Sequence, residues 1–134
     1  MMQSVGGGTA QNQGGNGRNY ISAKKSSELS TPGPVNVLVF LDENGDGIND
    51  GTFAFKCGFA AGSEAWQDLP ATYHNRNSSF SFADGHSEIH KWLDGRTYQG
   101  AWQCIGDSTH IPWNGYALTK SADYEWVDDH LPYQ

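Results

Sequence analysis

The feature that most constrains the fold is an Asp-Gly pair, Asp84-Gly85, which stands between two runs of alternating residues. Before the pair, Phe80 and Phe82 alternate with small residues, as in a strand with one buried face. An Asp-Gly pair between two such runs predicts a β-hairpin with a two-residue type I′ turn. In that register Phe80 lies opposite Ile89, and both belong with Phe82 to the buried face.

The same register places His86, Glu88, His90 and Trp92 together on the opposite face of the hairpin. Histidine side chains on one strand face can hold zinc when a third ligand comes from elsewhere, and His74 and His110 are the candidates here. The alternative is a polar sheet face whose side chains are solvated or hydrogen-bonded.

Three further elements are predicted from local patterns. Residues 35–41 are almost continuously apolar, which predicts a central strand covered on both faces. Apolar residues alternate with others over residues 53–57, which predicts a second strand. Ser121 is a suitable N-cap for a short helix over residues 122–130. The predicted fold class is therefore α+β, mostly β, with an antiparallel sheet.

Length and charge limit the organisation and the partners of the chain. Its 134 residues correspond to about one domain. Residues 1–18 form a flexible arm rich in Gly, Asn and Gln, and residues 19–134 form a single globular domain. The net charge of −7 repels phosphate backbones, so no nucleic-acid partner is expected. No apolar run approaches the ~20 residues of a membrane span.

The sharpest cluster of ligand-type side chains is an acidic loop between the two predicted strands. Its oxygen-bearing side chains recur at alternate positions around a glycine turn, which is how protein loops surround Ca²⁺. The candidate calcium ligands are Asp42, Asn44, Asp46, Ile48 (through its carbonyl) and Asp50. Phe53 stands where an EF-hand has a bidentate Glu, so the loop is either a calcium loop between strands or a metal-free turn.

His74 and Asp84 can be interpreted as an acid–base pair, but no nearby serine stands on a Gly-x-Ser-x-Gly elbow. A structural role is predicted instead. Asp84 and Gly85 form the turn, and the His74 side chain binds a carbonyl or carboxylate and ties the preceding loop to the hairpin. No residue is assigned to catalysis, and we do not expect an enzyme.

The cysteines and the tryptophans each allow two interpretations. Cys57 and Cys104 permit one disulfide in an oxidising compartment, or they are two independent buried thiols. The five tryptophans form either an exposed platform for sugars or part of a small aromatic core.

His74, nine residues and then Asp84-Gly85 is a spacing that resembles the C-terminal signature of prepilin-like proteins with an H-x9-DG domain. These are similar to type II secretion pseudopilins and type IV pilins. Further segments that resemble the family are residues 39–43, 48–53, 66–71, 91–92 and 96–97, and Asp123 with Trp126 resembles its closing Asp-x-x-Trp. The family's N-terminal leader and long apolar helix do not occur in this sequence, and we expect them upstream in a longer chain.

The resemblance implies the antiparallel-sheet globular head of a pilin-like protein, located outside the cytoplasm. It implies a structural subunit of a homo- or hetero-oligomeric filament, whose partners are other pilin-like subunits. Contact with a membrane would come only through the helix that this chain lacks. One alternative is a calcium-stabilised β-sandwich module that binds carbohydrate or protein. Another is a metal-dependent hydrolase that uses His86 and His90.

Overall fold

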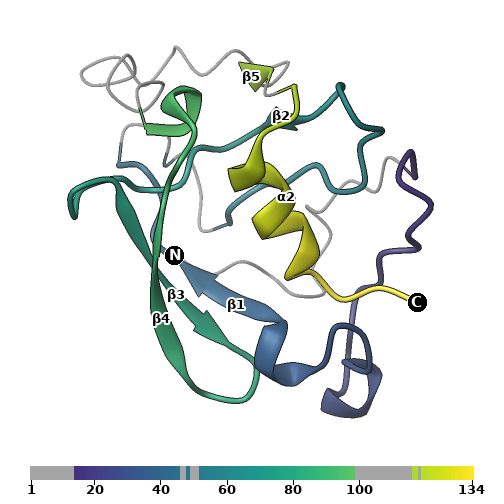
Figure 1. Cartoon of the computed structure of the whole chain (residues 1–134). Helices are drawn as coiled ribbons and strands as arrows, with labels where there is room; N and C mark the ends of the chain where they lie inside the picture. Colours follow the sequence, from purple (N-terminus) through teal and green to yellow (C-terminus); the bar gives the residue numbers. More distant parts are fainter. Residues whose placement is uncertain (1–13, 46–47, 49–51, 99–115, 118) are drawn as a thin grey trace.

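The structure is a computed structural model, which describes residues 14–45, 48, 52–98, 116–117 and 119–134. One antiparallel sheet has the strand order β1-β3-β4, and a second sheet pairs β2 with β5 (Figure 1). The strands are β1 (Leu38–Leu41), β2 (Ala65–Trp66), β3 (Asn77–Phe82), β4 (Ser87–Lys91) and β5 (Tyr116–Ala117), and the main helix is α2 (Ala122–Asp129). Single 3-10 turns occur at η1 (Ser26–Glu28) and η2 (Pro34–Asn36), and residues 95–98 are helical. This is a mostly-β α+β arrangement, as predicted.

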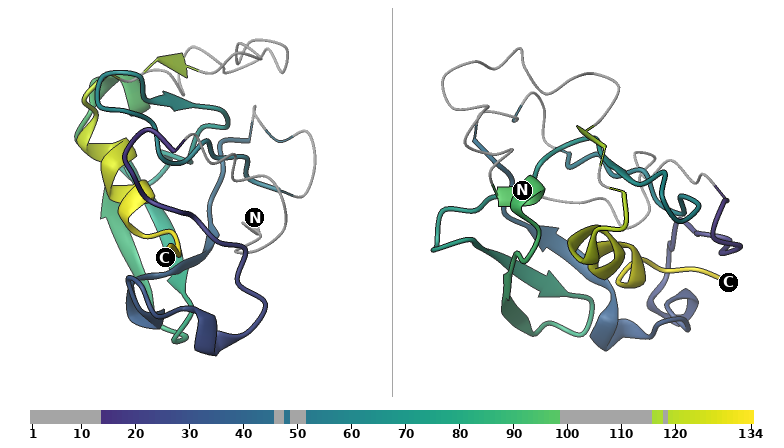
Figure 2. Two further views of the ribbon diagram at one scale, coloured as in Figure 1. Left: turned by 90° about the vertical axis from the view of Figure 1, so that its right-hand side faces the viewer. Right: turned by 45° about the horizontal axis from the view of Figure 1, so that its top comes forward.

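The predicted C-terminal helix is confirmed as α2. The hydroxyl of Ser121 accepts a hydrogen bond from the backbone N–H of Tyr124, so it caps the first turn as expected. The helix ends at Asp129, one residue earlier than predicted. It lies across one face of the three-stranded sheet, where Trp126 packs against Phe80 with ring centroids 4.9 Å apart (Figures 1 and 2).

The hairpin exists, but the predicted register is wrong by one residue. Phe80 lies opposite Glu88, and Ser79 lies opposite Ile89. The loop contains Ala83, Asp84 and Gly85, rather than two residues, because the N–H of Gly85 bonds to the carbonyl of Phe82 at 3.0 Å. Of the loop residues only Gly85 has a positive φ, of 95°. This is the pattern of a three-residue loop, in which a type I turn precedes a residue with positive φ.

A shift of one residue moves every side chain of a strand to the other face. Ile89, predicted to be buried, is 72% exposed, while Trp92 is 1% exposed. The buried face of the hairpin consists of Phe80 and Phe82 with Trp92 and the half-buried His90. The large indole of Trp92 buries more apolar surface than Ile89 can, which is the physical reason for the observed register.

The apolar stretch at residues 35–41 is not a central strand. Its first part is the 3-10 turn η2, because the N–H of Asn36 bonds to the carbonyl of Gly33 at 2.9 Å. Within the stretch the strand is limited to β1, which lies at the edge of the sheet, and the central strand is β3. Val35 and Phe40 are 52% and 47% exposed, so the stretch is not covered on both faces.

The stretch at residues 53–57 shows the predicted alternation of burial but is not assigned as a strand. Phe53, Phe55 and Cys57 are buried, and the residues between them are half-buried. The N–H of Ala54 donates instead to the side-chain carboxylate of Asp68, and the carbonyl of Ala54 accepts the N–H of Asp68. The pattern therefore predicted the buried face correctly but not the hydrogen-bonding partner.

The core between α2 and the sheet is rich in aromatic rings. Phe55 contacts Trp66 and Tyr124 with centroids 5.6 and 5.0 Å apart, and Trp66 contacts Trp92 at 6.1 Å. Because Trp66 and Trp92 are 0% and 1% exposed, these two tryptophans belong to the core and not to a sugar platform. Trp102 and Trp113 lie outside the described residues.

Candidate functional site

The hairpin loop is organised by the carboxylate of Asp84. Its Oδ1 accepts a hydrogen bond from the backbone N–H of His86 at 3.1 Å and lies 2.6 Å from the Nδ1 of the same residue. The hydrogen bond to the His86 side chain lowers the pKa of the Asp84 carboxyl group. Asp84 therefore supports its own turn, as predicted, and Gly85 supplies the positive φ.

His74 does not approach Asp84, so an acid–base pair between them is wrong. The six residues of β3 separate the two, a span of about 20 Å. The His74 side chain is exposed, and none of the described residues is seen to bond it. The predicted tie between the loop and the hairpin through this side chain is therefore not found in the described part of the chain.

The loop before β3 is tied to the hairpin by Trp92 and Ser78 instead. The Nε1 of Trp92 donates to the carbonyl of Ala71 at 2.9 Å and to the hydroxyl of Ser78 at 3.0 Å. The Ser78 hydroxyl donates in turn to the same carbonyl. All three residues are at most 1% exposed, so these bonds are shielded from water.

Helix α2 contributes Asp123 and Trp126 to the same hairpin. The two carboxylate oxygens of Asp123 accept the backbone N–H groups of Leu93 and Asp94, each at 2.9 Å. Trp126 stacks on His90, with ring centroids 3.8 Å apart and an interplanar angle of 20°. Because residues three apart share one helix face, one side of α2 both caps the end of the hairpin and covers its buried face.

The histidines of the hairpin, which are candidate zinc ligands in the sequence, contribute to packing and to the turn. His90 is packed beneath Trp126, and burial lowers the pKa of its imidazole. His86 stacks on Phe82, and Glu88 is exposed. No three His, Cys, Asp or Glu side chains of the described residues come together as a metal site. His110, the other candidate ligand, lies outside those residues.

The first part of the acidic loop continues from β1 and is held by its backbone. The carbonyl of Asp42 accepts the N–H of Ala71 at 2.7 Å, and the N–H of Asn44 donates to the carbonyl of Leu69 at 3.0 Å. Asn44 is buried, while Ile48 is 50% exposed. Two of the predicted ligands, Asp46 and Asp50, lie outside the described residues, so the calcium site stays a prediction.

Cys57 is fully buried in the aromatic core. Burial raises the pKa of its thiol to about 12, so the thiol stays protonated at neutral pH. Cys104 lies outside the described residues, and the disulfide between the two stays a prediction.

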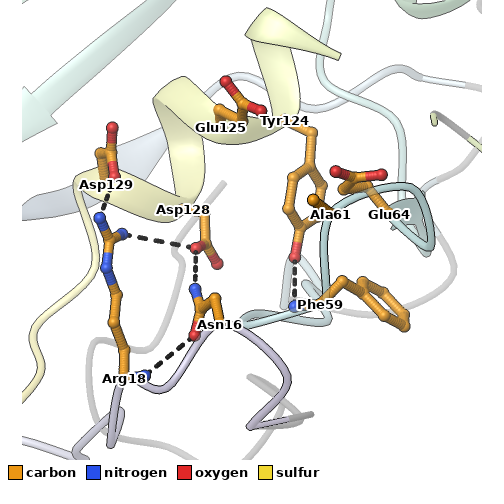
Figure 3. A pocket seen from close by; sticks show the side chains of 9 residues that line it. All are labelled: Asn16, Arg18, Phe59, Ala61, Glu64, Tyr124, Glu125, Asp128 and Asp129. Atoms are coloured by element: carbon orange, nitrogen blue, oxygen red, sulfur yellow. Dashed lines mark hydrogen bonds and ion pairs between the residues drawn. The ribbon is translucent and has the colours of Figure 1, made fainter. Parts of the chain in front are cut away.

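A polar cavity that the sequence did not predict lies between α2 and two loops, and its volume is about 330 Å³ (Figure 3). Its central group is Asp128, which is 4% exposed. The carboxylate accepts hydrogen bonds from the N–H of Gly58 at 2.8 Å, from the side-chain amide of Asn16 at 3.0 Å and from the hydroxyl of Tyr20. Arg18 lies 3.5 Å away. Asp128 thereby holds residues 14–18, the last part of the predicted arm, against the helix.

One signal for this cavity is present in the sequence. Tyr124, Val127, Asp128 and Leu131 follow the spacing of one helical face, and all four are buried. A carboxylate at an apolar-face position requires hydrogen-bond donors from other segments. The spacing does not reveal that the donors come from residues more than 60 positions upstream.

Burial raises the pKa of the Asp128 carboxyl group, against the opposing effects of Tyr20, Gly58 and Arg18. A carboxyl pKa that is higher in the folded state than its ordinary 3.8 means that the folded state binds the proton more tightly. This contribution to stability is full below the unfolded pKa and is lost as the pH rises through the folded pKa. Lowering the pH from 7 toward 4 should therefore stabilise the wild type relative to Asp128→Asn, in urea unfolding at each pH.

Asp94→Asn is the matched control of opposite sign. In the wild type, hydrogen bonds from Arg96 lower the pKa of the Asp94 carboxyl group. The contribution of Asp94 to stability is therefore present above the unfolded pKa and is lost as the pH falls through the folded pKa. The difference between wild type and Asp94→Asn should shrink on acidification. Parallel pH profiles for the two variants would contradict the assignment of Asp128.

Comparison of the chain with protein-family models, with curated proteins and with solved structures finds no match. Among the residues that the structure describes, no helix is long and apolar enough to cross a membrane.

Proposed function

We propose that this chain is the globular head of a pilin-like or type II secretion pseudopilin subunit, with a structural and non-catalytic role. One observation carries the proposal: the segments that resemble the family meet in one core. Trp66, Trp92 and Trp126 come from three of these segments, with ring centroids 6.1 Å apart for the first two and 6.4 Å apart for the last two. Side chains that pack against one another in this way stabilise the fold.

The polar residues of the same segments also bond to the backbone. Asp84 binds its own turn, and Asp123 binds the two N–H groups that follow the hairpin. A catalytic group needs an open position for a substrate, whereas both oxygens of the buried Asp123 carboxylate already have backbone partners. This favours a motif that builds a rigid head.

The proposed partners are other pilin-like subunits in an extracytoplasmic filament, which would be assembled through an N-terminal helix upstream of this chain. The proposal predicts that an antibody raised against the chain labels filaments at the cell surface in electron microscopy. It also predicts that the chain appears in the sheared filament fraction as part of a longer polypeptide. Labelling confined to the cytoplasm, or recovery of the chain only as a soluble monomer, would contradict it.

The alternative function, a calcium-stabilised module that binds carbohydrate or protein, has less support in the described residues. Their main sheet has three strands, and two of the five tryptophans are buried in the core. A glycan array would separate the two functions, because the module should bind a defined sugar and the filament head should not.

The calcium site can be tested separately from either function. Held together without a cation, the three aspartates of the loop repel one another, and at an effective ε near 20 two unit charges ~4 Å apart cost about 4 kcal/mol. We therefore expect calcium to raise the Tm of the wild type and to raise that of Asp46→Ala much less. Equal wild-type Tm values in calcium and in a chelator would show an ordinary metal-free turn.

A further inference from the structure

The two edges of the three-stranded sheet differ in how they are covered. At the β1 edge, the N–H of Leu38 donates to the carbonyl of His130 at 3.0 Å, and the carbonyl of Asp42 accepts the N–H of Ala71 at 2.7 Å. At the β4 edge, no described residue forms a further strand. Among the described residues, the outer edge of β4 is therefore left without a neighbouring strand, and we call it the open edge (Figure 1).

The backbone groups that face this open edge follow from the hairpin register. The residues that flank β4, His86 and Trp92, form backbone bonds to the β3 side at 3.0 and 2.8 Å. In an antiparallel pair, residues alternate between those that bond to the neighbouring strand and those that point away from it. The residues whose N–H and C=O point to the open edge are therefore Ser87, Ile89 and Lys91.

An exposed strand edge pairs readily with another strand unless charge or a bulge prevents it. The middle residue of this edge is Ile89, which is 72% exposed and is the most exposed large apolar side chain of the described residues. Ser87 and Lys91 are exposed as well. The edge thus combines an apolar centre with backbone groups that have no partner among the described residues. Its acidic residue, Glu88, and its basic residue, Lys91, leave it without net charge.

We propose that β4 pairs with β4 of a second copy of this chain, antiparallel and about a two-fold axis at Ile89. In this register Ile89 lies opposite the partner's Ile89, and Ser87 lies opposite the partner's Lys91. Each of these pairs consists of residues that face the open edge, so each exchanges two backbone hydrogen bonds. The result is a continuous six-stranded sheet with a self-complementary interface.

The distribution of charge favours a second copy in this orientation. Antiparallel pairing about Ile89 places Glu88 opposite the partner's His90 and Lys91 opposite the partner's Ser87, so no two like charges lie directly opposite each other. A parallel pairing in register would place Glu88 beside its own equivalent and Lys91 beside its own, and like charges directly opposite are destabilising. This contact is distinct from filament assembly and does not depend on it, because it uses only the β4 strand.

Sedimentation velocity over a range of concentrations tests the proposal. The wild type should form a reversible dimer, and Ile89→Lys should raise the Kd at least about tenfold because two lysines meet at the axis. Val35→Lys is the matched control, since Val35 is also exposed, at 52%, but lies in η2. Its Kd should equal that of the wild type. Far-UV circular dichroism would check that both variants fold.

A cysteine at the axis tests the register itself. Directly opposite residues of a bonded pair have Cα atoms about 5.5 Å apart, which suits a disulfide. Ile89→Cys should form a cross-linked dimer under mild oxidation, and Val35→Cys should not. The proposal is overturned if the wild type stays monomeric at every concentration, or if both cysteine variants cross-link equally. It is also overturned if the β4 edge binds only a different protein and never a second copy of this chain.

Discussion

Trp92→Ala is expected to lower the free energy of unfolding by about 3–5 kcal/mol, the range for removing a large buried aromatic side chain. Trp92 is 1% exposed, and its ring contacts Trp66 and Phe80 with centroids 6.1 and 5.7 Å apart. The substitution also removes the donor that binds Ala71 and the Ser78 hydroxyl. Urea unfolding followed by far-UV circular dichroism would measure the loss.

Two further variants separate the contributions of the indole. Trp92→Phe keeps an aromatic ring but removes the Nε1–H. The Ser78 hydroxyl still donates to the Ala71 carbonyl, so loss of the indole hydrogen bonds should cost only about 0.5–1.5 kcal/mol. Leu93→Ala is the control, because Leu93 is 70% exposed and should change stability by no more than about 0.5 kcal/mol. A Trp92→Ala cost no greater than that of Leu93→Ala would contradict the observed hairpin register.

Asp123→Ala is expected to lower the free energy of unfolding by about 2–5 kcal/mol. It removes the buried carboxylate that accepts the partly buried backbone N–H groups of Leu93 and Asp94, and a hydrogen bond to a charged group contributes about 1.5–3 kcal/mol. The segment that joins the hairpin to the following chain should loosen at the same time. Amide hydrogen exchange at Leu93 and Asp94 should therefore accelerate more than exchange in β3.

Glu125→Ala is the matched control for this change. Glu125 also lies in the acidic first turn of α2, but it is exposed, and no hydrogen bond of its side chain to a described residue is seen. Both variants remove one negative charge near the helix N-terminus, which contributes about 0.3–1 kcal/mol. A loss for Asp123→Ala beyond that of Glu125→Ala measures the cap on the hairpin. Equal losses would mean that only the helix dipole is affected.

Features that depend on neighbouring residues were predictable from the sequence. Ser121 caps α2 because its hydroxyl reaches the N–H three residues ahead, a contact that needs no other segment. The hairpin at Asp84 exists because glycine readily adopts the positive φ of the turn. The alternation at residues 53–57 predicted which side chains are buried, although the segment is bonded to Asp68 and not to a strand.

The candidate site was predictable only in part. Asp84 could be placed in its turn, because an aspartate two residues before an N–H binds it locally. The role of His74 could not be predicted correctly, because the spacing of His74 and Asp84 along the chain does not show that an extended strand separates them in space. Asp128 was not predicted, since its donors come from the distant residues Asn16, Tyr20 and Gly58.

The sequence by itself determined that a hairpin forms at Asp84-Gly85 and that α2 begins after Ser121, because both depend on contacts within a few residues. The tertiary structure decided the hairpin register. Loops of two and three residues are both compatible with an Asp-Gly pair, and they bury opposite faces of β4. The choice depends on α2, whose Trp126 covers His90 and lies near Trp92. Burial of these rings outweighs burial of Ile89, which leaves Ile89 exposed at the edge of the sheet.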